Sequence, residues 1–208
     1  MNIIKEVAAL SPLRRNQQIM SFYLLFVNAL LGAAIVMLYV DLFNADGLVL
    51  KNYALSVLGL AIFIPALGKM PKEHPMKTFH IAIGFEVLAF VFYMLTIYDV
   101  FPHVILPIAT IVTYSSNIIM SPILNQTTSI VTAGCADYSL LKSKLDMLYT
   151  AIGAAVGACF VIFDVHLTVV MVSYASALIM ARYYRHKVLT EIYKDTPENI
   201  LDGDASKA

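Results

Sequence analysis

The sequence predicts an all-α fold, a polytopic membrane bundle of six transmembrane helices with both termini in the cytoplasm. Of its 208 residues, 60% are hydrophobic and only 13% are charged, whereas soluble domains carry about 25% charged residues. Apolar runs of roughly 20 residues, the length that spans a bilayer, recur along the chain. The basic residues concentrate in every second loop between these runs, as they do in membrane proteins.

The predicted elements follow in chain order. Residues 1–18 are expected to form a cytoplasmic interfacial segment and residues 185–208 a polar cytoplasmic tail. The spans are predicted at 19–40, 52–68, 78–98, 104–124, 145–163 and 167–184.

The composition of individual spans supports their assignment. The first has no charge and lacks a clear cleavage site after it, so it is typical of an anchor rather than a signal peptide. Residues 100–136 are free of Asp, Glu, Lys and Arg but too few for two spans, which predicts one long helix. Arg182 stands near the end of the last span, where we expect it to reach the headgroups.

Orientation follows from the distribution of Lys and Arg. Alternation across the predicted spans puts 13 of the 14 basic residues on one side and only Lys51 on the other. Because basic residues in short loops stay on the cytoplasmic side, this predicts a plasma (inner) membrane protein with both ends inside. The acidic Asp41, Asp99 and Asp164 belong to the opposite side.

Several classes of function are disfavoured. Equal numbers of basic and acidic residues, 14 of each, give no basic surface for nucleic acid. Cys135 and Cys159 have neither disulfide-scaffold nor metal-ligand spacing, so no metal or cofactor is expected. Hydrolase, metalloprotease, nucleotide-binding and channel-filter motifs are absent, which disfavours an enzyme.

Polar residues gather on one face of the fourth predicted span. Thr110, Tyr114, Asn117, Ser121 and Asn125 recur at helical spacing. On the first span, Asn28 shares a face with Ser21 and Gly32. These residues either line a polar pathway or bond across a packed bundle, and the sequence leaves both interpretations open.

Glu86 is the acidic residue deepest in a predicted span. A charge there costs on the order of 3 kcal/mol, so its side chain should face the interior and find a partner. It could carry a proton or simply hold two helices together. On the fifth span, Gly153 and Gly157 form a G-x-x-x-G motif that allows close approach of another helix.

These features together resemble one six-helix half of a major facilitator superfamily transporter. Residues 68–77, GKMPKEHPMK, are similar to that family's loop pattern at Gly68 and Lys77 but differ at Lys72 and Pro75. The family's basic residue in the fourth helix is missing. The resemblance implies that the first and fourth spans face a central pathway. Because the two halves are parallel repeats, it also implies a parallel homodimer or a second six-helix half as partner.

The sequence therefore predicts a half-size transporter of a small solute, embedded in the lipid bilayer and acting as a dimer. Asn28, Glu86, Thr110, Tyr114, Asn117 and Ser121 are its candidate pathway residues. The alternative is a membrane interaction protein that does not transport, such as an immunity or exclusion factor that binds a protein toxin.

Overall fold

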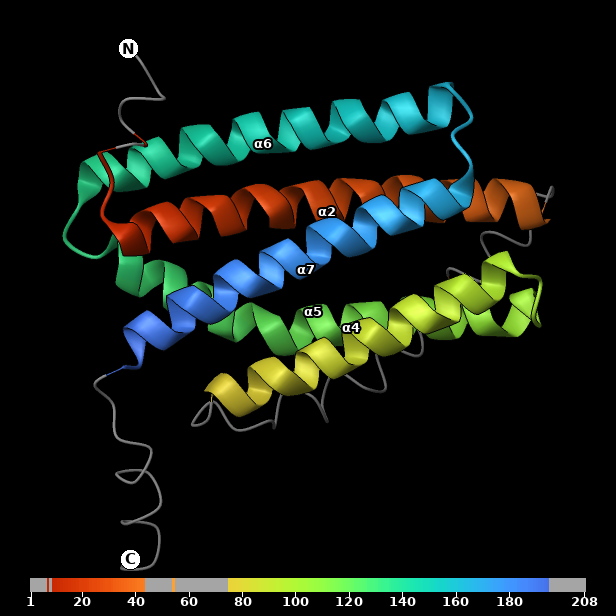
Figure 1. Cartoon of the computed structure of the whole chain (residues 1–208), viewed down its shortest axis with the longest axis horizontal. Helices are drawn as coiled ribbons and strands as arrows, with labels where there is room; N and C mark the ends of the chain where they lie inside the picture. Colours follow the sequence, from red (N-terminus) through yellow and green to blue (C-terminus); the bar gives the residue numbers. More distant parts are fainter. Residues whose placement is uncertain (1–6, 8, 44–53, 55–74, 195–208) are drawn as a thin grey trace, which may run out of the picture.

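The computed structural model describes residues 7, 9–43, 54 and 75–194, and all regular structure within them is helical. Five long helices follow in order (Figure 1): α2 (Pro12–Phe43), α4 (Pro75–Ile97), α5 (Pro102–Thr132), α6 (Ala136–Ile162) and α7 (Leu167–Ile192). Each is long and apolar enough to cross a bilayer. The chain is therefore a membrane protein.

The predicted count of six transmembrane helices is wrong. The described part of the chain contains five helices of membrane-spanning length. The predicted span at 52–68 lies outside the described residues. The five described helices correspond to the other five predicted spans, at 19–40, 78–98, 104–124, 145–163 and 167–184.

The helices also extend beyond the predicted apolar runs. Residues 12–18 are the first turns of α2 rather than a separate segment. Helix α6 begins at Ala136, and α7 continues to Ile192. The single helix predicted within residues 100–136 is confirmed: α5 runs past Pro107 and Pro122 and ends just before Gly134, whose positive φ of 70° turns the chain toward α6.

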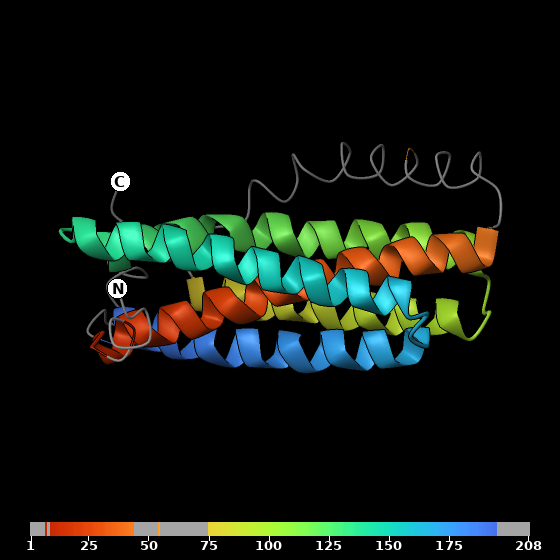
Figure 2. The same cartoon turned by 90° about the horizontal axis from the view of Figure 1, so that it is seen from above.

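Helix α2 is the centre of the bundle, with α6 on one side and α7 on the other, while α4 packs along α5 (Figure 2). Contacts between α4 and α7 join the two groups, but α5 barely touches α6. Helices α2 and α4 run in the same direction, so that the end of α2 and the start of α4 lie at opposite ends of the bundle (Figure 1). The main hydrophobic core fills the space between α2, α4, α5 and α7.

The G-x-x-x-G motif of α6 lies against α2, as the sequence predicts for a packing motif. A Cβ atom added at Gly153 would come within 3.0 Å of the Ala29 Cβ, and one at Gly157 within 3.2 Å of the Ala29 carbonyl oxygen. Both glycines are buried. Their missing side chains let the backbones of α2 and α6 approach closely.

Large apolar side chains cover the outside of the bundle. They include Val87 and Val91 on α4, Ile162 on α6, and Val172 and Ile179 on α7, each more than 40% exposed. Soluble monomers rarely expose apolar surface on this scale. An outer surface of this kind fits contact with lipid.

Candidate functional site: a polar groove and a buried ion pair

A groove runs along the bundle beside α6, with α5 as its other wall at one end and α2 farther along. Three adjoining hollows form it, of about 470, 680 and 480 Å³. The first and second share Lys142 and Asp146, and the second and third share Thr150 and Ala154. We call this surface, lined by α2, α5 and α6, the lateral groove.

The lateral groove is most polar near the end of the bundle where α2 and α6 begin. Its first hollow is lined by Ser21 of α2, Asn125, Thr128 and Ser129 of α5, and Lys142 and Asp146 of α6, among others. Three helices thus contribute hydroxyl, amide and charged groups to one space. Farther along, the third hollow is mostly apolar and contains Asn28.

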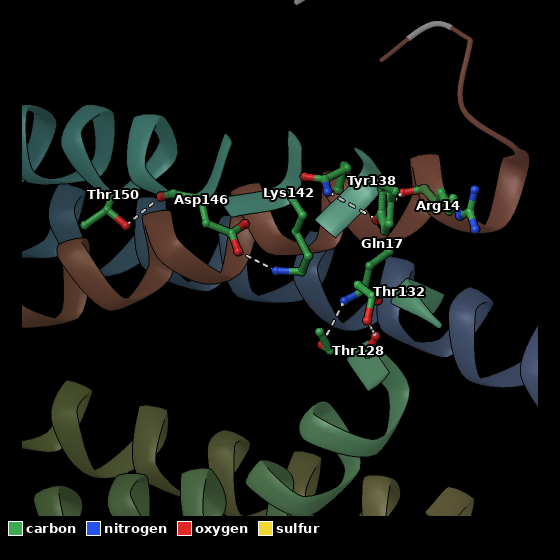
Figure 3. A network of polar contacts seen from close by, with 9 residues as sticks. Arg14, Gln17, Thr128, Thr132, Tyr138, Lys142, Asp146 and Thr150 are labelled. Atoms are coloured by element: carbon green, nitrogen blue, oxygen red, sulfur yellow. Dashed lines mark hydrogen bonds and ion pairs between the residues drawn. The ribbon is translucent and has the colours of Figure 1, made fainter. Parts of the chain in front are cut away.

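A network of polar contacts holds this end of the groove (Figure 3). Gln17 Nε2 donates to Thr128 Oγ1 at 3.3 Å, which joins α2 to α5. Gln18 Nε2 donates to the Tyr138 hydroxyl at 3.2 Å, which in turn donates to the Arg14 carbonyl oxygen at 3.3 Å. The Arg14 guanidinium lies 5.1 Å from the centre of the Tyr138 ring. These contacts fix the start of α2 between α5 and α6.

Lys142 and Asp146 form an ion pair one helical turn apart on α6. The sequence allows this pairing, but places Asp146 at a helix end, whereas the structure places it inside α6. Asp146 Oδ2 accepts from Lys142, and the other carboxylate oxygen, Oδ1, is buried without a hydrogen-bond donor in the described part of the chain. A ligand in the groove that carries an N–H or O–H group could supply the missing donor.

The predicted pathway residues divide among several environments. Asn28 is exposed and lines the third hollow, and Ser21 and Gly32 of the same predicted face also line the groove. Thr110 is buried and donates to the Leu106 carbonyl oxygen within α5. The next three members of the α5 stripe, Tyr114, Asn117 and Ser121, are exposed and line none of the described hollows.

Glu86 lies outside the groove, at the middle of α4. It is 5% exposed and accepts a hydrogen bond from Arg182 Nε at 2.7 Å and a second one from Arg182 Nη2. The Ser116 hydroxyl of α5 lies 3.1 Å from the same carboxylate. The expectation that Glu86 faces the interior and finds a partner is confirmed, and its contacts join α4, α5 and α7.

The predicted position of Arg182 at the headgroups is wrong. Arg182 is 8% exposed, and Arg185 on the same face of α7 is 2% exposed. Helix α7 continues for ten residues beyond Arg182, whose side chain is directed into the bundle and donates to Glu86. This bidentate pair compensates the charge of Arg182 within the protein. Sequence reasoning missed both arginines because Arg182 was assigned to the end of the last span and Arg185 to the cytoplasmic tail.

The described basic residues lie in one half of the bundle. They occur near the starts of α2, α4 and α6 and in the second half of α7: Arg14, Arg15, Lys77, Lys142, Lys144, Arg182, Arg185, Lys187 and Lys194. The turns at the other end contain the acidic residues Asp99 and Asp164. The uneven charge distribution expected from the sequence is therefore present in the structure. The described basic residues lie toward one end of the bundle, and the turns at the other end are acidic.

The comparisons with protein families, curated proteins and solved structures found no match to this chain. Among the described residues, no cluster of three or more His, Cys, Asp or Glu side chains could hold a metal ion.

Proposed function

We propose that the protein is a half-size transporter that moves a small hydrophilic solute across a membrane along the lateral groove. The observation that carries this proposal is the continuity of the three hollows, whose lining passes from Lys142 and Asp146 to Asn28. Amide, hydroxyl and charged groups on a bundle surface are costly in lipid, so they favour a water-filled path.

The groove is open along one side, which favours a second subunit as its other wall. Helix α6 has small residues there, including Ala151, Ala154 and Ala158, that permit close helix contact. We therefore propose a parallel homodimer with the solute between the two grooves. The resemblance to a major facilitator half supports the same arrangement, because α2 and α5 hold the first and fourth predicted spans that face the pathway in that family.

The charge asymmetry supports an orientation with the Arg14 end of the bundle in the cytoplasm. In a bacterial cell this corresponds to the inner membrane. The most polar hollow, around Lys142 and Asp146, then opens near the cytoplasmic surface, and Asn28 lies deeper in the bilayer.

Counterflow into proteoliposomes tests the proposal. Purified protein is screened with labelled amino acids, sugars, organic acids and nucleosides against empty liposomes. For a transported solute, we expect Lys142→Met to lower the initial rate at least about tenfold, because the loss of one charged hydrogen bond costs about 1.5–3 kcal/mol. Asn125→Leu should lower the rate by about two- to tenfold, because a neutral hydrogen bond contributes about 0.5–1.5 kcal/mol. The matched control is Lys144→Met, which removes an exposed lysine of α6 that lines none of the described hollows.

Exchange of no solute above the empty-liposome rate would contradict transport, as would equal rates for the groove variants and wild type. The interaction-protein alternative makes a different prediction. Deletion of the gene would change sensitivity to a membrane-active protein toxin while solute fluxes stay the same.

A further inference from the structure

Three charged side chains are buried in the described part of the bundle: Glu86, Arg182 and Arg185. An arginine keeps its proton in proteins, so this group carries a net positive charge inside the bundle. The Glu86 carboxylate is already occupied by two bonds from Arg182 and by Ser116. It cannot offer the same hydrogen bonds to Arg185.

Most donors of Arg185 have no acceptor. Its Nε donates to the Met20 sulfur at 3.4 Å, which is a weak acceptor, and both Nη1 and Nη2 are buried without a partner in the described residues. Arg182 Nη1 is unpartnered as well. Three guanidinium nitrogens are thus buried without acceptors on one α7 face, since residues three apart on a helix are neighbours.

The positive charges of Arg182 and Arg185 repel each other. Arg185 lies within range of the charges of both Arg182 and Glu86. Water could fill the empty hydrogen-bonding positions but would leave the net charge uncompensated, and an isolated buried cation is strongly unfavourable. An anion satisfies the donors and cancels the charge together. Guanidinium groups are also the donors that proteins use most for planar oxyanions.

We propose that Arg182 and Arg185 form a binding site for one small monovalent anion, a halide or small oxyanion, between α2, α4 and α7. The site is separate from the lateral groove, which α2, α5 and α6 line. Occupation of the site joins α7 to α2 next to Met20 and to α4 through Glu86. It therefore stabilises the contact between the two helix groups of the bundle.

Thermal unfolding of the detergent-solubilised protein, followed by circular dichroism, tests the site. Chloride or nitrate replaces gluconate at constant ionic strength, because gluconate is too bulky for an enclosed site. We expect the wild-type Tm to rise saturably by about 3 °C at tenfold excess over half-saturation. Arg185→Met should show no such rise, since its side chain fills similar space without charge. Lys187→Met, which removes an exposed cation of the same helix, should keep the full response.

Equilibrium dialysis of the wild-type protein with radioactive chloride gives a second measurement that needs no variant. We expect about one bound chloride per chain, displaced by nitrate and not by gluconate. A wild-type Tm independent of the anion, together with no bound chloride, would overturn the proposal. Equal responses of Arg185→Met and wild type would overturn it as well.

Discussion

Glu86 and Arg182 have opposite charges at the middle of two packed helices, where neither could remain alone. The exposed fractions of 5% and 8% show that both charges are removed from lipid and water. The attraction between the two charges has to exceed the free-energy cost of removing both from water. Two hydrogen bonds from Arg182 to the Glu86 carboxylate, with Ser116 alongside, strengthen that attraction. The pair specifies how α4, α5 and α7 meet.

We expect Glu86→Leu to lower the free energy of unfolding by about 3–5 kcal/mol, because it leaves Arg182 charged and without its partner. The double variant Glu86→Leu with Arg182→Met should recover most of this loss, since an apolar pair of similar volume avoids both charges. Unfolding of the purified protein in mixed micelles measures each value. A double variant as unstable as the single one would show that the loss comes from packing rather than from the unpaired charge.

Half of this pair could be predicted from the sequence. Glu86 lies far from both ends of its apolar run, so its burial follows from position alone. Arg182 is 96 residues away and within three residues of the end of the predicted run at 184, where a snorkelling side chain is the ordinary outcome. Its role depends on the extension of α7 to Ile192. Only the packing of α7 against α4 reveals that role.

At the scale of the helix pair, α2 and α6 are joined by two glycines. Helix periodicity is enough to predict that Gly153 and Gly157 share a face, and close packing is the usual use of that spacing. It does not say which helix packs there. The structure shows that the two glycines pack on Ala29 of α2. Helix α2 thus has α6 on one side and α7 on the other.

Gly157→Ala should destabilise the protein by about 1 kcal/mol, because the new methyl group would lie 3.2 Å from the Ala29 carbonyl oxygen. The matched control is Gly84→Ala on α4, where nothing lies within 4 Å of the added carbon. That change should be neutral or stabilise by up to about 1 kcal/mol, since alanine is the better helix former. Equal shifts in the unfolding midpoint of the two variants would contradict close α2–α6 packing.

For the molecule as a whole, the sequence predicted a helical membrane bundle with charge asymmetry, and the structure confirms both in the described residues. The number of helices and the shape of the lateral groove could not be predicted from the sequence. Tyr114, Asn117 and Asn125 lie on one face of α5, yet only Asn125 lines a described hollow. The reason is that α5 has few contacts with α6 and moves away from it along its length. Such divergence depends on distant contacts that periodicity cannot represent.

A groove open on one side makes a geometric prediction about assembly. In a parallel two-fold dimer with the groove at the interface, a residue near the middle of the groove lies close to the axis and therefore close to its own copy. We therefore expect Ala154→Cys, in a chain whose native Cys135 and Cys159 are replaced by alanine, to cross-link in membranes with a short bis-maleimide. Ile179→Cys in the same background is the control, because residue 179 is 67% exposed on α7, which packs on the side of α2 away from α6. Equal dimer yields at the two positions would indicate random collision, and a monomer in native mass spectrometry with no cross-link at residue 154 would contradict the dimer.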